Sequence, residues 1–332
     1  MRAAAGLGAT AILSAGLGCK STAQASSPAS SKSGRYGDKL KGVVAQRSDK
    51  KVLGNHDHNE DRVTELVQRT VADLLGVKDP REAFRTLFRP DDVVAIKVNC
   101  LAGPGLSSSP AVVNALVKGL RSIGITYRNI IIWERSTAEL TRAGFKANRY
   151  SDSGPRCFGN NESGFERELS FSGDVGSLWS KILADKATAL INVPVLKDHD
   201  LAGIGCGMKN MYGAIHNPNR YHDNNCDPFV ADVSAHPYVK DKLRLVLCDA
   251  LTAQYHGGPA RVLSHQWHPA AVLASKDPVA HDKIAQTMIE AQRAKHGMAS
   301  LAESKRPPKW IKTAAARGLG EHNPDKIKLL KS

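Results

Sequence analysis

The chain has 332 residues, of which 42% are hydrophobic and 23% are charged, so it is long enough to bury a sizeable core and is not an intrinsically disordered protein. Its formal net charge is +14, but the basic residues form no single block and aromatic residues make up only 5% of the chain. Nucleic-acid binders usually interleave basic side chains with stacking aromatics, so we expect no nucleic-acid partner and a small anionic ligand instead.

The six cysteines show no C-x-x-C pair and no short repeated spacing. This pattern argues against a ferredoxin-type cluster or a zinc ribbon, so no iron–sulfur cofactor is expected. A single bound transition metal stays open as a cofactor.

Residues 1–19 are apolar and rich in small residues, with one arginine, Arg2, near the start. This segment predicts an export signal that is similar to the part of a twin-arginine signal following its arginine pair, and hence an exported, periplasmic protein. The pair itself is absent, so we expect a truncated signal. Gly16–Cys19 also resembles a defective lipoprotein motif, which leaves a lipid anchor on Cys19 as an alternative. The run is too short for a confident membrane span, and none is expected in the mature chain.

Residues 20–38 are rich in Ser, Ala, Lys and Gly and predict a flexible linker. From Gly42 onwards, strand and helix patterns alternate. Buried strands are predicted at 43–45, 92–98, 129–133, 187–195, 243–248 and 270–274. Helices are predicted at 63–75, 110–120 and 278–296, with shorter ones at 178–183 and 308–316. The first helix has a capping-box pattern at Asp57–Glu60, and the second has Ser109 as N-cap before Pro110.

This alternation predicts an α/β fold with a mainly parallel or mixed central sheet, flanking helices and long polar loop insertions at the carboxyl ends of the strands. Residues 135–172 are the longest insertion. The domain should span residues 39–302, and residues 303–332 should form a basic C-terminal tail.

Polar residues follow most of the predicted strands directly. They are Lys97 and Asn99, Glu134, Lys197 and His199, Asp249, and Asp277. In a mainly parallel sheet the carboxyl ends share one edge, where ligands bind. We therefore expect these side chains to converge in one crevice.

Lysine at such an edge can clamp a carboxylate or phosphate, and its burial can lower its pKa towards base chemistry. One hypothesis is an enzyme in which Lys97, Lys197 and Lys209 hold an anionic substrate or cofactor and His199 acts as acid or base. Asp249 would orient His199 or a metal. Lys197 is a further candidate for a catalytic role through a depressed pKa.

Cys206, His216, His222 and Cys226 could instead supply metal ligands, although their spacing matches no standard zinc signature. The alternative hypothesis is accordingly a non-catalytic periplasmic metal- or ligand-binding or accessory protein.

Several motifs resemble the domain-of-unknown-function 362 (DUF362) family. They are AIKVN before a Ser-Pro-led helix, the strand IIIWE, the segment INVPVLKDHDLAGIGCGMKNMYG, and LCDALTAQYHGGP with SKDPVAHD downstream. The resemblance covers about residues 42–295 and implies one α/β domain with its site at the matching positions: Lys97, Asn99, Lys197, His199, Lys209, Asn210, Gly213, Asp249 and Asp277. Some members carry iron–sulfur motifs that this chain lacks, so cluster binding is not carried over. The resemblance implies no reaction.

Overall fold

The computed structural model describes residues 40–54 and 59–332. The predicted export signal, the linker and Asp57 of the predicted capping box lie outside these residues. No helix within the described ranges is both long and apolar enough to cross a membrane.

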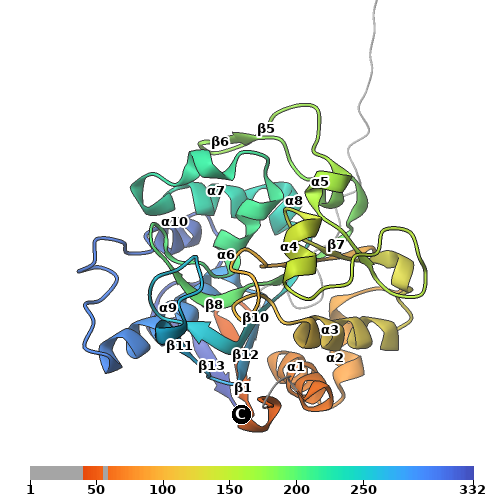
Figure 1. The fold of residues 1–332 in the computed structure, drawn as a ribbon, viewed down its shortest axis with the longest axis horizontal. Helices are drawn as coiled ribbons and strands as arrows, with labels where there is room; N and C mark the ends of the chain where they lie inside the picture. Colours follow the sequence, from red (N-terminus) through yellow and green to blue (C-terminus); the bar gives the residue numbers. More distant parts are fainter. Residues whose placement is uncertain (1–39, 55–58) are drawn as a thin grey trace, which may run out of the picture. The chain divides into compact units, whose positions relative to one another are not determined.

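A mixed sheet forms the centre of the described chain, as predicted (Figure 1). Its main path runs, in spatial order, through β13 (Lys328–Lys331), β1 (Val43–Ser48), β12 (Ala271–Ser275), β10 (Leu243–Gln254), β7 (Ala189–Val193), β2 (Val94–Val98), β3 (Ile130–Trp133) and β4 (Arg156–Cys157). Along this path only β12 is antiparallel to its neighbours. The strands β8 (Val195–His199), β9 (Gly203–Ile204) and β11 (Gln266–Trp267) extend the sheet beside β10.

Helices cover both faces of this sheet. One face carries α1 (Glu60–Leu75), α2 (Pro80–Leu87) and α3 (Pro110–Ser122). The other carries α6 (Gly207–Asn210), α7 (Phe229–Ala235), α9 (Pro278–Lys295) and α10 (Trp310–Ala316). The remaining short elements are α4 (Thr137–Arg142), α5 (Asn160–Ser163), α8 (Pro237–Lys240) and the hairpin of β5 (Ser170–Ser172) and β6 (Val175–Ser177).

Strand periodicity decides which core each residue joins. In β2, Val94, Ile96 and Val98 enter the core beneath α1–α3, whereas Ala95 enters the core on the opposite face. Lys97 shares the parity of Ala95, so its side chain points towards α6 rather than towards α3. The burial of a lysine inside this sheet therefore follows from its place in an otherwise apolar strand.

Most predicted helix ends match the structure. Ser109 caps α3 by accepting the Ala111 N–H, and Gly76 ends α1 in the left-handed conformation. The N-cap of α1 is Asn59, which accepts the Arg62 N–H, and not the predicted Asp57. The side-chain amide of Asn offers the same acceptor two positions later.

The predicted strand 187–195 is divided in the structure. Pro194 separates β7 from β8, and β8 continues to His199. Lys197 and His199 thus lie within a strand and not in a loop behind one.

Residues 303–332 belong to the same folded unit as the rest of the described chain. Trp310 on α10 is fully buried and donates its indole N–H to the Ala202 carbonyl, and β13 pairs in parallel with β1. The α/β unit therefore extends beyond residue 302. The sequence pattern did not predict the edge strand β13, because its apolar pair Leu329–Leu330 is short and most of the surrounding residues are basic.

Candidate functional site

A cavity of about 450 Å³ opens above the carboxyl ends of β2, β3 and β8. Segments between residues 205 and 222 form its other wall. It is lined by most of the predicted site residues, namely Asn99, Glu134, Lys197, His199, Lys209, Asn210, Gly213 and His222. The carboxyl-edge argument thus brings together residues that lie more than 120 positions apart in the chain.

Lys97 lies directly behind this lining and organises it. Its Nζ donates to Glu134 Oε1 at 3.0 Å, to the Val98 carbonyl at 2.6 Å and to Asn210 Oδ1 at 3.4 Å. Burial opposes ionisation of Glu134, but the Lys97 ammonium and the Arg135 N–H hold the pKa of that carboxyl below its usual value. Lys97 and Glu134 therefore form a buried ion pair, which makes Lys97 a structural cation.

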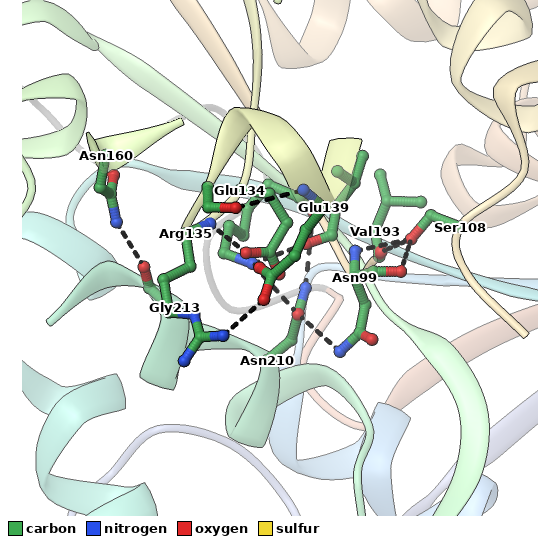
Figure 2. A network of polar contacts seen from close by, with 12 residues as sticks. Asn99, Ser108, Glu134, Arg135, Glu139, Asn160, Val193, Asn210 and Gly213 are labelled. Atoms are coloured by element: carbon green, nitrogen blue, oxygen red, sulfur yellow. Dashed lines mark hydrogen bonds and ion pairs between the residues drawn. The ribbon is translucent and has the colours of Figure 1, made fainter. Parts of the chain in front are cut away.

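Asn210 connects Lys97 to the cavity lining, and Figure 2 shows its contact with Asn99. Its Oδ1 also accepts from Asn99 Nδ2 at 3.1 Å, and its Nδ2 donates to Asn192 Oδ1 at 2.8 Å. Asn99 in turn accepts the Nζ proton of Lys197 at 2.9 Å. One chain of hydrogen bonds thus runs from Glu134 through Lys97, Asn210 and Asn99 to Lys197, so the two predicted lysines converge.

Lys197 is 1% exposed, and burial lowers its pKa to about 8. The alternation of β8 turns Lys197 and His199 towards the cavity and Asp198 to the other side. There Asp198 is paired with Arg306 at 2.7 Å and accepts the Gly258 N–H. Asp198, which lies between the two cavity residues in the sequence, is therefore paired on the other side of the strand and does not neutralise Lys197.

His199 is a neutral hydrogen-bond donor in this arrangement. Its Nδ1 accepts the backbone N–H groups of Leu201 and Ala202 and also lies 3.0 Å from Asp200 Oδ1; the two N–H donors favour the tautomer with the ring proton on Nε2. Burial, with Lys209 and His222 nearby, lowers the pKa of His199 to about 2. The charged form of His199 is therefore disfavoured at neutral pH, and its predicted acid–base role stays a prediction.

Lys209, on α6, forms the second cationic group of the lining. Its Nζ lies 3.8 Å from the centre of the Tyr212 ring and 3.2 Å from Nε2 of His222. Burial lowers the pKa of Lys209 to about 8. Burial and then Lys209 lower the pKa of His222, so His222 is a neutral acceptor for a Lys209 proton.

Gly213, in the 3-10 helix η4 (Met211–Ala214), is needed for the close approach of this turn to Lys97. A Cβ at this position would lie 2.7 Å from Lys97 Cε, and the Gly213 carbonyl accepts from Asn160 Nδ2 at 2.7 Å (Figure 2). The glycine therefore lets Lys97, Glu134 and the cavity wall pack without a gap.

Sequence reasoning missed some lining residues as members of the site. Arg135 and Glu139, which both line the cavity, form an ion pair (Figure 2), and Tyr212 lies beneath Lys209. The wall is completed by Leu101, Asp200, Leu201, Gly205, Pro218, Asn219 and Pro259. Arg135 follows Glu134 at the strand end, so its position was available as a signal. The Tyr212 hydroxyl donates to the Tyr221 carbonyl at 2.6 Å, and no local sequence pattern predicts this contact.

Two of the predicted carboxylates, Asp249 and Asp277, lie outside the cavity lining. Asp249 accepts the Ser109 N–H at 2.7 Å and the Leu251 N–H at 3.0 Å, and so fixes the start of α3 against β10. Asp277 is the N-cap of α9 and accepts four backbone N–H groups, from Gly42, Val279, Ala280 and Glu321. Because β12 is antiparallel to β10, Asp277 follows it at the opposite edge of the sheet, where the neighbouring strands begin.

The four predicted metal ligands do not form one site. His222 lines the cavity, the ring of His216 packs edge-on against Phe165, and Cys226 is buried with its Sγ 3.9 Å from the His222 carbonyl. Cys206 lies instead beside Cys248, with 3.7 Å between the sulfur atoms. The tight turns between 211 and 226 point these side chains in different directions, which sequence spacing alone did not reveal.

Comparison with known proteins places the chain in a family but supplies no activity. No curated protein matches the sequence. Among solved structures the chain is similar to a crystal structure of a protein from Thermotoga maritima, a structural genomics target, with 12% identity and a TM-score of 0.44. That match covers 71% of this chain and only 60% of the other chain. The family model for the domain of unknown function DUF362 matches residues 94–287, which are 194 of the 332 residues and include every element that lines the cavity. The chain therefore belongs to the DUF362 family.

Proposed function

We propose that the cavity binds a small anionic molecule, bearing a carboxylate or phosphate group, between Lys197 and Lys209. The observation that supports this proposal is that both lysines line the cavity without a carboxylate counter-ion. Within the described residues, neither Nζ has a carboxylate partner within 4.0 Å, although both side chains are buried. A buried cation without a counter-ion is costly, and an anionic ligand would supply one.

Lys97 shows what a satisfied lysine looks like in the same site. It is as deeply buried as Lys197, yet it has Glu134 at 3.0 Å and two further acceptors. Lys197 has one amide oxygen, and Lys209 has an imidazole nitrogen and an aromatic face. The chain thus neutralises the lysine behind the wall and leaves the two at the wall for a ligand.

The remaining donors suit the same ligand class. His199 offers its Nε2–H, and Arg135, whose side chain is 48% exposed, lies at the lining with part of its guanidinium free of Glu139. A volume of about 450 Å³ accommodates a metabolite-sized molecule. Cationic and neutral donors around a half-buried volume favour an anion of modest size over a large polymer.

A second candidate function is catalysis within this cavity, with Lys209 as the proton-transferring group. The specific observation is the 3.2 Å contact between Lys209 Nζ and His222 Nε2, together with the lowered pKa of Lys209, at about 8. A lysine with such a pKa can donate or accept a proton near neutral pH, and His222 can share that proton. This candidate requires the same ligand site and adds a reaction to it.

The experiment that tests the proposal is the identification of small molecules released by denaturing the purified protein, with mass spectrometry as the readout. Binding of pyrophosphate, citrate and sulfate as probe anions is then measured by calorimetry. Lys197→Met and Lys209→Met should each weaken the binding of a probe anion about 10- to 100-fold, because each removes one charge-assisted hydrogen bond of about 1.5–3 kcal/mol.

The matched control is Lys118→Met, since Lys118 is an exposed lysine on α3, outside the cavity lining. It should leave the affinity unchanged. Equal affinities for the wild type and both cavity variants would contradict the proposal. For the catalytic candidate, conversion of the identified ligand by the wild type and its loss in His222→Asn with binding retained is the expected result.

A further inference from the structure

A second group of chemically active side chains lies apart from the cavity. Cys206 precedes α6, Cys248 lies in β10, and His281 lies in the first turns of α9, and all three are 0% exposed. We call these three residues the thiol cluster. None of them lines the cavity described above, so the cluster requires an explanation of its own.

The spacing within the thiol cluster matches a metal coordination sphere. One ligand atom from each residue lies within 4.8 Å of the others, and the two sulfur atoms are 3.7 Å apart. In a tetrahedral zinc site with Zn–S bonds of about 2.3 Å, two thiolates are about 3.8 Å apart. The sulfur atoms therefore stand at the separation of two zinc ligands, well beyond the bonded distance of a disulfide, about 2.05 Å.

His281 is held as a metal-binding histidine is held. Its Nδ1 donates to Asp282 Oδ1 at 2.8 Å, so a metal that displaces the other ring proton would find the lone pair on Nε2. This Nε2 is buried and has no nitrogen or oxygen partner among the described residues, and the ring also meets the Cys248 thiol of the same cluster. An unpartnered buried nitrogen is uncommon, whereas a carboxylate that orients the opposite ring nitrogen is the usual support for a zinc-bound histidine.

We propose that Cys206, Cys248 and His281 bind one Zn²⁺ ion. Two thiolates and a neutral imidazole neutralise the charge of a divalent ion, and this avoids burying a net charge among the three ligands. The monovalent alternative Cu⁺ would leave one negative charge at the same buried position. A water molecule is the fourth ligand in this assignment, because three protein ligands leave one position of a tetrahedron open.

The ion would act on the fold at a specific place. Asp282 also accepts the backbone N–H groups of Gly207 and Met208, each at 2.8 Å, and these residues follow Cys206 directly. The same carboxylate thus supports His281 and anchors α6, the helix that carries Lys209 and Asn210 into the cavity. A bound ion would connect the start of α6 to β10 and α9 through its three ligands, and so would add to the contacts that Asp282 already makes.

The test is a titration of the reduced, full-length protein with Co²⁺ under anaerobic conditions, followed by displacement with Zn²⁺. One equivalent of Co²⁺ should give thiolate-to-cobalt charge-transfer bands, which Zn²⁺ abolishes. X-ray absorption of the zinc-loaded wild type should show two sulfur ligands at about 2.3 Å and nitrogen or oxygen ligands at about 2.0–2.1 Å. This measurement needs no variant and so does not depend on whether a variant folds.

Variants then locate the ion. Cys206→Ser, Cys248→Ser and His281→Gln should each weaken Co²⁺ binding by more than the about 10- to 100-fold expected for loss of a supporting residue such as Asp282. Cys157→Ser, which removes a buried thiol outside the cluster, and Lys209→Met, which alters the cavity, should both leave one equivalent of metal bound.

Any one of the following results would overturn the assignment. They are a cobalt or zinc spectrum without sulfur ligands, undiminished metal binding in both cysteine variants, and binding of Cu⁺ without Zn²⁺. A Cys206–Cys248 disulfide that forms in the purified protein in place of metal loading would equally exclude it. Because Lys209→Met retains the metal in this scheme, failure of the zinc site and failure of the anion site are distinguishable.

Discussion

Asp277 at one edge of the sheet, and Lys197 and Lys209 at the other, differ in whether the chain itself supplies a partner for a buried charge. At the edge without the cavity, the carboxylate of Asp277 accepts four backbone N–H groups, so the chain itself satisfies the charge. At the cavity edge, Lys197 and Lys209 are buried with no carboxylate within 4.0 Å among the described residues. The first arrangement stabilises the fold, and the second is explained by a partner that the chain does not provide. This difference separates a structural ionisable group from a functional one better than burial does.

The largest effect that we expect from this comparison is at Asp277. Asp277→Ala removes the acceptor of four N–H groups and should lower the free energy of unfolding by about 3–5 kcal/mol, since buried donors lose their partner. Chemical denaturation measures this change. The matched control is Asp79→Ala at the exposed N-cap of α2, where only the Arg81 N–H is capped and a loss of about 1 kcal/mol is expected.

Lys209→Met tests the cavity edge by the same measurement of the free energy of unfolding. Replacing a buried cation that has no counter-ion by an apolar side chain of similar length removes the cost of desolvating the charge, so the free energy of unfolding should stay unchanged or rise. A loss of stability comparable to that of Asp277→Ala would show that Lys209 is a structural cation after all, and the comparison between the edges would fail.

Next in size is the effect of filling the space at Gly213. Gly213→Ala places a methyl group 2.7 Å from Lys97 Cε and should destabilise the protein by about 1–3 kcal/mol, because the Lys97–Glu134 pair must move. Thermal unfolding would report the change, and probe-anion affinity should fall with it. Gly154→Ala, where a Cβ meets nothing within 4 Å, is the matched control and should shift stability by about 0.5 kcal/mol or less.

The position of the cavity could be predicted from the sequence because it depends on one topological rule. Asn99, Glu134 and Lys197 all follow or end parallel strands, and parallel strands deliver their carboxyl ends to one edge. The same rule gave a wrong place for Asp277. Strand direction is set by long-range pairing, and nothing in the local pattern of residues 270–277 shows that β12 runs against its neighbours.

The roles of the site residues were harder to predict than their location. Whether a lysine is structural or free depends on which carboxylate reaches it, and Glu134 reaches Lys97 and not Lys197. The neutral state of His199 depends on its burial and on the neighbouring Lys209 and His222. The regrouping of Cys206 with Cys248 and His281 depends on the packing of α6 against α9 and β10. Such contacts arise only once the chain has folded.

The most diagnostic effect concerns the pH dependence of anion binding. Burial lowers the pKa values of Lys197 and Lys209 to about 8, from 10.5, so both lysines lose their protons above about pH 8 in the free protein. A bound anion favours the charged forms and raises both pKa values, so binding must take up protons near and above pH 8. The affinity for sulfate, whose own charge is constant in this range, should therefore be level below about pH 7 and fall up to about tenfold per pH unit per lysine above pH 8.

Calorimetry in buffers of different ionisation enthalpy measures the proton uptake directly. His199, with its pKa at about 2, adds no change between pH 5 and 7. Affinity that stays level up to pH 10 would mean that neither lysine binds the anion. The lack of carboxylate partners at the cavity edge would then have no consequence for ligand binding.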